Sequence, residues 1–402
     1  MYRIQIMQVI DMKLVALVLA LIIVSGACDS QAGDGDRNGI VNAESGEPVV
    51  EAGFVMGADL SYVNQILDHG GVYRSGGEVQ DPYKIFAGNG ATAARFRLFK
   101  NPEWTRDIYD NTGDQMYHNL DDVKLGIERA KEQGMSVLLD FHYSNTWADP
   151  GEQKIPEAWQ NAGPEAVQDS VYAYTYSTLM NLSENEALPE MVQIGNETNC
   201  GMVHPIGNVC ENASWRQFGD LLNSGIRAVR DVEAETGSHI SVILHVAQPE
   251  NVGYWFDNVI NEGNVTDFDV VGFSYYIPWS EVPLTQISTY VETFRHKYER
   301  EVMILETAYP WTLDNSDSYG NIFGINSLVD GYPATQDGQR RFMTDLVQEV
   351  KEGGGHGLFY WEPAWISSDM KDLWGTGSAW ENNALFDFDG NAHEGFEYMN
   401  IE

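Results

Sequence analysis

Two glutamates are associated with apolar runs that lie far apart in the sequence. Glu197 comes directly after Asn196 at the end of the run 190–197. Glu306 lies within the run 302–309. A strand that is buried on both faces reads as a continuous apolar run and has no structural use for a carboxylate at its tip. Both side chains are therefore candidates for chemistry where a core meets a cleft.

A pair of glutamates suits the hydrolysis of a glycosidic bond. A retaining glycosidase needs two carboxyl groups about 5–5.5 Å apart, one protonated to assist the leaving oxygen and one ionised to attack the anomeric carbon. Asn196 would direct its amide to the sugar 2-hydroxyl. Arg97, with Tyr275 as a second donor, would keep Glu306 ionised. The alternative interpretation is that each glutamate is only salt-bridged in the core.

The elements that must position these residues are buried strands alternating with helices. The apolar runs that read as strands are 53–61, 91–99, 135–144, 190–197, 241–247, 269–276, 302–309 and 356–364. Helical spacing occurs between several of them, and one helical stretch ends on Gly134, which is typical of a helix C-terminus. The pattern predicts an α/β fold, a (β/α)8 TIM barrel that forms a single catalytic domain over residues 51–402. A doubly wound sheet is the alternative, but the Gly-rich phosphate motif that it predicts after the first strand is not in the sequence.

The ends of the runs support a shared site. Seven runs finish in polar or aromatic residues, namely Asp59, Arg95 and Arg97, His142 and Tyr143, Asn196 and Glu197, Tyr275 and Tyr276, Glu306, and Trp361 and Glu362. In a closed barrel the carboxyl ends of all strands meet at one rim, where active sites lie. We therefore expect these side chains to surround one cleft.

Composition excludes several classes of partner. The 402-residue chain is 43% hydrophobic and rich in aromatic residues, which indicates a large packed core. Lys and Arg number 23 against 60 Asp and Glu, a formal charge of −37. A surface this negative repels phosphate backbones and anionic lipid headgroups, so nucleic acid and membrane surfaces are not expected partners. A neutral substrate would be indifferent to the charge.

The N-terminus has the layout of an export signal. Lys13 precedes an apolar run over residues 14–24, which is too short to cross a bilayer. We interpret residues 1–28 as a signal peptide, with a lipoprotein signal acylated at Cys28 as the alternative to ordinary cleavage. Residues 29–50 are polar, Gly-rich and without periodicity, which predicts a flexible linker. The protein is therefore expected in the periplasm, at the cell surface as a lipoprotein, or outside the cell.

Two further cysteines remain once Cys28 is set aside. In an exported chain the single pair Cys200 and Cys210 favours a disulfide. A metal site that includes His204 is the alternative, but two cysteines and one loose histidine make a poor ligand set.

The order of the motifs resembles one known family. The motifs are "GADLSYV", "RFRLF", "LDFHYSNTWADPGEQKIPEAW", "QIGNET", "SYY", "ETAYPW" and "FYWEPAW". Together they resemble glycoside hydrolase family 53, the endo-β-1,4-galactanases of clan A, from about residue 53 to the end of the chain. The run "DFHYSNTWADPG" is the most specific of them. The resemblance implies a retaining mechanism, with Glu197 as acid/base and Glu306 as nucleophile, and internal cleavage of the β-1,4-galactan of pectin (type I arabinogalactan).

The same resemblance implies a set of sugar contacts: Asp59, Arg97, His142, Trp147, Asp149, Asn196, Tyr275 and Trp361. Polar groups suit sugar hydroxyls, and tryptophan faces stack on the C–H face of a pyranose ring. For Trp361 a structural role as a plug of the barrel is the alternative. A monomer without a catalytic cofactor is expected.

A structural calcium ion is a further expectation. Asp317, Tyr319 and Asn321 place oxygen atoms at alternate positions of one loop. Bacterial members of the family tie this loop to the one after the eighth strand through calcium, which implies Ser378, through its carbonyl, and Glu381 as further ligands. Tyr319 stands where the family has a histidine. The alternative is an acidic, solvated turn.

Two other functions remain open at this point. A surface glycan-binding protein that had lost hydrolysis would lack one of the two glutamates, and both are present. Another clan A hydrolase acting on xylan, mannan or cellulose would share the strand-end pair, and only the substrate distinguishes it.

Overall fold

The computed structural model describes residues 53–110, 115–211 and 213–401. The predicted signal peptide 1–28, including Cys28, and the predicted linker 29–50 lie outside these residues. In the part of the chain that is described, no helix is both long enough and apolar enough to span a membrane.

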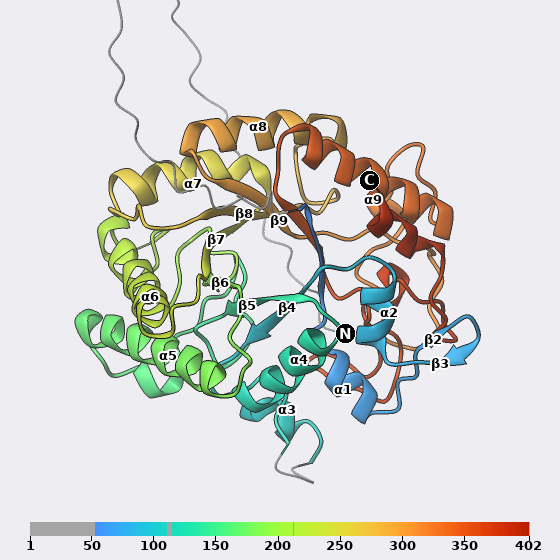
Figure 1. The fold of residues 1–402 in the computed structure, drawn as a ribbon, viewed down its shortest axis with the longest axis horizontal. Coiled ribbons are helices and arrows are strands. Elements are labelled where there is room, and N and C mark those ends of the chain that lie inside the picture. Colours follow the sequence, from blue (N-terminus) through green and yellow to red (C-terminus); the bar gives the residue numbers. More distant parts are fainter. Residues whose placement is uncertain (1–52, 111–114, 212, 402) are drawn as a thin grey trace, which may run out of the picture. The chain divides into compact units, whose positions relative to one another are not determined.

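Parallel strands close into a barrel (Figure 1). In chain order they are β1 (Val55–Asp59), β4 (Ala93–Leu98), β5 (Ser136–Phe141), β6 (Met191–Ile194), β7 (Ser241–Ala247), β8 (Val270–Ser274), β9 (Glu301–Glu306) and β10 (Gly357–Tyr360). Around the barrel the order is β1-β10-β9-β8-β7-β6-β5-β4, and β4 pairs with β1 to close it. Each of the eight predicted runs overlaps one of these strands, so the predicted (β/α)8 barrel is confirmed.

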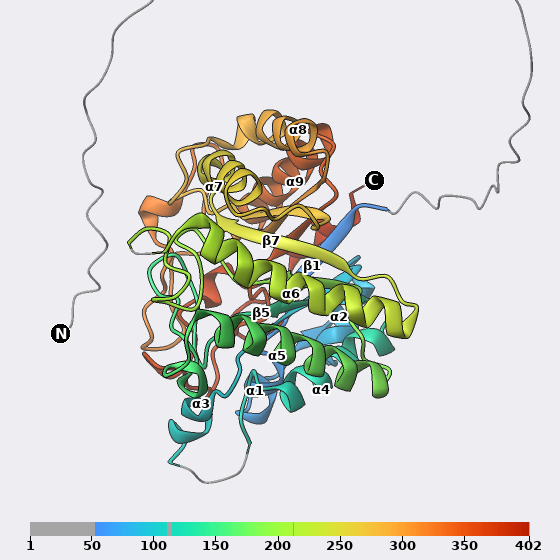
Figure 2. The same cartoon turned by 90° about the vertical axis from the view of Figure 1, so that its left-hand side faces the viewer.

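Helices surround the barrel, and the side view shows α5 and α6 packed against each other along it (Figure 2). The helices are α1 (Val63–Asp68), α2 (Pro82–Gly88), α3 (Glu103–Asp107), α4 (Leu120–Glu132), α5 (Pro164–Glu184), α6 (Trp215–Thr236), α7 (Pro249–Asn261), α8 (Ile287–Tyr298) and α9 (Gln336–Glu352). A short hairpin of β2 (Arg74–Ser75) and β3 (Glu78–Val79) lies outside the barrel sheet.

Helix α6 illustrates how local sequence sets these elements. Ser214 caps its start by accepting a hydrogen bond from the backbone N–H of Gln217 at 3.1 Å. Gly237 ends it with a φ of 71°, a left-handed conformation that glycine adopts without a Cβ clash. Phe218 and Leu222, one turn apart, are buried on the same face. This face therefore packs inward, as an amphipathic helix requires.

Inside the barrel an apolar layer changes to a polar layer toward the carboxyl ends of the strands. One apolar cluster fills the interior with side chains that include Ala93, Leu138, Met191 and Ile243. Two residues further along the same strands, on the same face, stand the fully buried Arg95, Asp140, Gln193 and His245. The barrel thus carries a buried polar layer directly beneath its carboxyl-end rim, where a site is expected.

Strands β8 and β9 pair with an irregular register near this rim. Phe273 pairs with Ile304, but Ser274 pairs with Glu306, so Leu305 is an extra residue in β9. Leu305 already faces the barrel interior. Strict alternation would turn the next side chain, Glu306, away from the interior, and the bulge turns it back.

Candidate active site

The carboxyl ends of the strands surround a cavity of about 550 Å³. Glu197 and Glu306 both line it. Six of the predicted sugar contacts also line it, namely Arg97, His142, Trp147, Asp149, Asn196 and Trp361. The other two, Asp59 and Tyr275, lie outside its lining. The structure therefore brings together both glutamates and most of the predicted contacts.

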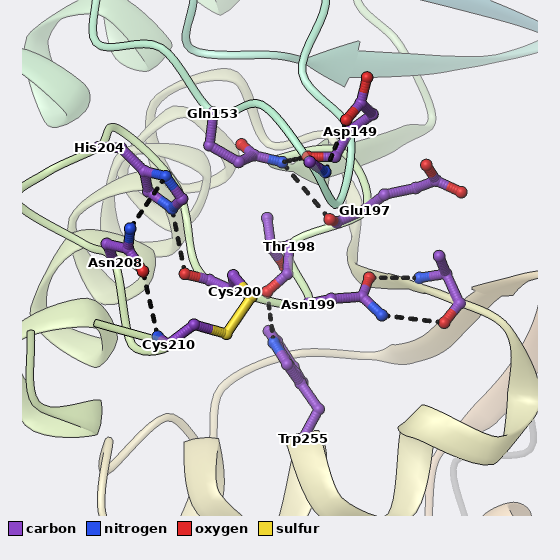
Figure 3. Close-up of a disulfide and its surroundings, with 12 residues drawn as sticks. Asp149, Gln153, Glu197, Thr198, Asn199, Cys200, His204, Asn208, Cys210 and Trp255 are labelled. Atoms are coloured by element: carbon purple, nitrogen blue, oxygen red, sulfur yellow. Dashed lines mark hydrogen bonds between the residues drawn. A yellow bond between two sulfur atoms is a disulfide. The ribbon is translucent and has the colours of Figure 1, made fainter. Parts of the chain in front are cut away.

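Glu197 projects from a sharp turn after β6 (Figure 3). Its φ is 42°, a left-handed conformation that is uncommon for a residue with a side chain and must be held by its surroundings. The next residue, Thr198, donates both its N–H and its hydroxyl to the carbonyl oxygen of His245 in β7, each at 3.0 Å. Trp255 of α7 donates its indole N–H to the Thr198 carbonyl at 2.6 Å. These contacts fix the direction in which Glu197 points.

Cys200 and Cys210 form a disulfide in the segment that follows Glu197 (Figure 3). This is the pairing that the cysteine count favours. His204, the alternative metal ligand, lies 3.1 Å from the Cys200 carbonyl oxygen through its Nε2. A cross-link over a loop this short restricts the chain on one side of the turn that carries Glu197.

Glu306 is held by one cation and one hydroxyl. Arg95 Nη1 lies 2.9 Å from Glu306 Oε1. Tyr276 donates its hydroxyl to Glu306 Oε2 at 3.0 Å. The prediction that Arg97 and Tyr275 play these two roles was wrong.

Tyr276, and not Tyr275, contacts Glu306 because side chains alternate along β8 and the residues that follow it. Ser274 and Tyr276 share the face toward the cavity, and the Ser274 hydroxyl donates to Glu197 Oε1 at 2.6 Å. Tyr275 faces the other way and donates its hydroxyl to the carbonyl of Val282 at 2.9 Å. A role for Tyr275 at the sugar is therefore not supported by its position.

Arg97 lies one layer nearer the rim than Arg95. Its guanidinium hydrogen-bonds to the buried Glu362 and lies over the rings of Tyr62 and Trp147, 4.2 and 4.4 Å from their centroids. Arg97 therefore supports the aromatic wall of the cavity, and the cation that contacts Glu306 is Arg95.

Arg95 is the hub of the buried polar layer. Its guanidinium nitrogens lie 2.8–2.9 Å from oxygens of Asp59, Asp140, Asn196 and Glu306. Burial opposes its charge, but the surrounding carboxylates outweigh burial and raise the pKa of Arg95 above its ordinary value. Asp59, which was expected to touch sugar, instead helps to hold this permanent cation.

The surroundings of the two glutamates separate their protonation states. Burial raises the pKa of Glu197 well above its ordinary value, and the charge of Glu306 raises it further. Burial raises the pKa of Glu306 to about 7, while Arg95 and the Tyr276 hydroxyl oppose the rise. The pair therefore favours a proton on Glu197 and a negative charge on Glu306, because Arg95 contacts only the latter.

The remaining predicted contacts form the wall around this pair. Asn196 donates to the Ala148 carbonyl at 2.8 Å and accepts from Arg95, so its amide orientation is fixed. His142 accepts from the Ala148 N–H through Nδ1, and its Nε2 lies 3.1 Å from Asp140. Trp361 meets Trp380 edge-on with ring centroids 4.9 Å apart. Their contacts with sugar stay predictions.

The cavity has lining residues that the sequence analysis did not single out. Gln248, directly after β7, and Asn251, in the first turn of α7, line it. Trp279 and Trp374 line it with 54% and 67% of their surfaces exposed. Gln248 is the first polar residue after its apolar run, so the strand-end rule applied one residue later would have found it. No comparable signal marks the two tryptophans, which lie in loops beyond the strand ends.

The residues expected to bind calcium are engaged with hydrogen-bond donors. Asp317 accepts from the N–H of Tyr319 and from the N–H of Ser378, at 2.6 and 2.9 Å. Glu381 accepts from both the N–H and the hydroxyl of Ser316. Each carboxylate therefore already faces hydrogen-bond donors at oxygens where a calcium ion would need free lone pairs.

The other expected ligands fit a cation no better. Tyr319 uses its hydroxyl as a donor to Asp372. Asn321 directs its side-chain amide N–H at Asn315, and its Oδ1, the atom that calcium would use, faces the N–H of Asn382 at 3.5 Å. Among the described residues, no group of three or more His, Cys, Asp or Glu side chains is arranged to hold a metal ion. The donor set present therefore does not fit a calcium site.

Comparisons with known proteins agree with this geometry. The sequence pattern of glycosyl hydrolase family 53 matches residues 55–399. The chain is 44% identical over 342 residues to an arabinogalactan endo-beta-1,4-galactanase of Cellvibrio japonicus (strain Ueda107), covering 83% of this chain and 86% of that protein. It is 34% identical over 375 residues to an endo-beta-1,4-galactanase of Bacillus subtilis (strain 168), covering 84% and 83%. A GH53 catalytic domain of Ignisphaera aggregans has a similar fold, with a TM-score of 0.76, 34% identity, and coverage of 90% of this chain and 98% of that one.

Proposed function

Because the chain belongs to glycosyl hydrolase family 53, we propose that it is an endo-β-1,4-galactanase that cuts the β-1,4-galactan of pectin internally with retention of configuration. The observation that carries the mechanism is the unequal environment of two glutamates in one cavity. Glu306 is bound by Arg95 and Tyr276, whereas the Glu197 carboxyl accepts, among the residues that the structure describes, from the Ser274 hydroxyl.

In the first step Glu306 attacks the anomeric carbon of the galactosyl unit and forms an ester with it. Glu197 gives its proton to the glycosidic oxygen, so the C–O bond breaks and the shortened chain leaves with a free hydroxyl. Arg95 and Tyr276 keep the Glu306 carboxylate ionised and correctly oriented before the attack.

In the second step the roles of the two residues change. Glu197, now ionised, removes a proton from a water molecule, and the water oxygen attacks the anomeric carbon. The ester to Glu306 breaks, and the product keeps the β configuration after two inversions. The site is then in its starting state, with Glu306 ionised beside Arg95 and Glu197 protonated. These steps need no cofactor.

Substrate contacts follow from the wall of the cavity. Trp147 and Trp361 offer aromatic surface for the C–H faces of galactose, and His142, Asp149 and Asn196 offer polar atoms for hydroxyls. A neutral polysaccharide can approach the protein despite the protein's formal charge of −37, because the polysaccharide carries no charge.

Release of reducing ends from a panel of polysaccharides tests the proposal. We expect release from β-1,4-galactan and little from xylan, mannan or cellulose, with a rapid fall in viscosity that marks internal cuts. NMR of the first product should show the β anomer. Activity on xylan with galactan inert would assign the chain to another glycanase, and binding of galactan without any release would identify a glycan-binding protein.

We also propose that the protein is exported, because residues 1–28 have the layout of a signal peptide. We propose that it is a monomer, and that Cys28 is the site of a lipid if the signal is of the lipoprotein type. Fractionation of cells that carry the natural chain and the Cys28→Ser variant tests the lipid. A lipoprotein needs detergent for release, and the variant would not. Equal release of both proteins without detergent would exclude the anchor, and recovery in the cytosol would exclude export.

A further inference from the structure

Two loops at the rim are joined by side-chain hydrogen bonds. The clasp, as we name it, links the segment 311–323 after β9 with the segment 365–383 after β10. Asp317 in the first segment accepts from the Ser367 hydroxyl at 2.5 Å and from the Ser378 N–H at 2.9 Å. In the same direction, Asn382 of the second segment donates its amide to the carbonyl of Phe323 in the first at 2.9 Å.

The clasp occupies the atoms that calcium would use, and its packing leaves little room for change. A Cβ at Gly377 would lie 2.0 Å from Asp317 Oδ2, so the backbone of one segment contacts the carboxylate of the other directly. A direct contact of this kind replaces a bridging ion, because the carboxylate already has its donors.

At the cavity end of the clasp lies Tyr319. Its hydroxyl lies 2.9 and 2.8 Å from the two carboxylate oxygens of Asp372, which is only 6% exposed. The Tyr319 ring packs on Gly375, where an added Cβ would lie 2.7 Å from the ring. Tyr319 thus contacts the turn 372–375 through both its hydroxyl and its ring.

Asp372 in turn sets the position of Trp374. Its Oδ1 accepts from the N–H groups of Trp374 and Gly375, each at 2.8 Å, which closes the turn. Trp374 stands on this turn at the edge of the cavity, 67% exposed, with its ring 6.5 Å from that of Trp147. An exposed indole at the edge of a sugar-binding cavity is a stacking surface, and its direction depends on the turn beneath it.

We infer that Tyr319 is a positioning residue, which holds the sugar-stacking Trp374 through Asp372 in a clasp that requires no calcium. The inference rests on the proposed function, because it concerns substrate contacts in the same cavity. Trp374 lies on the loop after β10, and the contacts described above for Glu197 and Glu306 come from Ser274, Tyr276 and Arg95. Its role is therefore in binding and not in bond cleavage.

The test begins with Tyr319→Phe, which removes the hydroxyl and keeps the ring that packs on Gly375. With long galacto-oligosaccharides we expect KM to rise about fivefold, the loss that a charge-assisted hydrogen bond can cause, while kcat changes less than about twofold. Tyr176→Phe is the matched control, because it removes a hydroxyl that donates to Glu235 at 2.8 Å on the outer helices. The control should match the wild type in both constants.

A double-mutant cycle makes the test specific to Trp374. Trp374→Ala should raise KM at least as much as Tyr319→Phe, and the double variant should equal Trp374→Ala alone. Independent, additive effects would overturn the inference, since they would mean that Tyr319 acts elsewhere. A fall in kcat for Tyr319→Phe would also overturn it, because the residue would then take part in the reaction.

A second arm needs no turnover. The Tm of the wild type should be the same in calcium and in EDTA, and calcium should not lower the KM of Tyr319→Phe. A rise in Tm with calcium would overturn the metal-free clasp. If the wild type does not cut galactan, the proposed function fails, while the Tm comparison still decides whether the clasp binds calcium.

Discussion

The two ends of the barrel use arginine in different ways. At the carboxyl end, Arg95 is 1% exposed and contacts Asp59, Asp140 and Glu306 inside the barrel. At the amino end, the side chain of Arg230 in α6 is 22% exposed and lies 2.8–3.0 Å from carboxylates at the surface. Each arginine contacts several carboxylates, but the Arg95 network is buried and the Arg230 network is in contact with water.

The difference shows where this fold places its function. A buried ion cluster is costly to desolvate, and an apolar filling of the same volume is often at least as stable. The amino end of a barrel strand serves stability, whereas the carboxyl end carries the chemistry. The Arg95 cluster is explained by the charge it provides at Glu306, and the Arg230 cluster by ordinary surface pairing.

The largest expected effect comes from removing Glu306, the proposed nucleophile. Glu306→Ala should lower kcat on galactan by at least about 10⁴-fold, because no ester can form. The denaturation midpoint should not fall, since Arg95 keeps Asp59 and Asp140 as partners. Reducing-end assays and urea unfolding measure the two quantities.

Chemical rescue distinguishes the two glutamates. With an activated galactoside, azide should restore turnover of Glu306→Ala and give the α-azide, because azide attacks from the nucleophile's side. Glu197→Ala should give the β-azide, because azide then replaces water in the second step. Reversed products would exchange the two roles.

The same substitution at both ends sharpens the comparison. Arg95→Met should lower the free energy of unfolding by about 3–5 kcal/mol, because it leaves buried carboxylates without their cation. Arg230→Met should cost about 1 kcal/mol or less, because its partners remain in contact with water. Urea denaturation of both variants measures this difference, and equal losses would contradict the contrast between the two ends.

The pH profile of kcat/KM should be bell-shaped. Activity requires Glu306 ionised, so it falls below a pH near the Glu306 pKa of about 7. It also requires Glu197 protonated, so it falls again at higher pH as Glu197 loses its proton. The Ser274 hydroxyl lowers the pKa of Glu197. Ser274→Ala should therefore move the alkaline limb to higher pH, and movement to lower pH would exclude this role.

The smallest effect is expected at an exposed pair of the amino end. Lys131 lies 2.5 Å from Glu190, and both side chains are partly exposed. Lys131→Met should change the free energy of unfolding by no more than about 0.5 kcal/mol and leave kcat/KM unchanged. A loss of activity would show that this end of the barrel influences the site.

The fold could be predicted from sequence, and the two glutamates of the cavity could be located, because both depend on composition along a strand. A strand buried on both faces must be apolar, so the eight runs stood out, and polar residues at their ends marked the rim. Glu197 and Glu306 were found by this rule alone. The resemblance was needed for the galactan substrate.

The neighbours of Glu306 were harder to predict. Arg95 and Arg97 lie on the same face of β4, so side-chain alternation does not distinguish which of them contacts Glu306. Their different depth in the barrel decides it. Tyr276 could have been chosen over Tyr275, because it continues the inward face of Val270 and Ser274. The spacing of oxygen-bearing residues such as Asp317 indicates that their oxygen atoms lie close together in one loop. It does not indicate which hydrogen-bond donors already contact those oxygen atoms.

The extra residue in β9 has a consequence for anyone who assigns activity from genomes. A paralogue that gained one residue in β8 between Phe273 and Ser274 would pair regularly with β9 and would still align with a glutamate at 306. With regular pairing restored, the alternation of side chains would turn that carboxylate toward the helices, and the cavity would lack one of its two glutamates. Gene surveys of this family should therefore check the length of β8 as well as the presence of both glutamates.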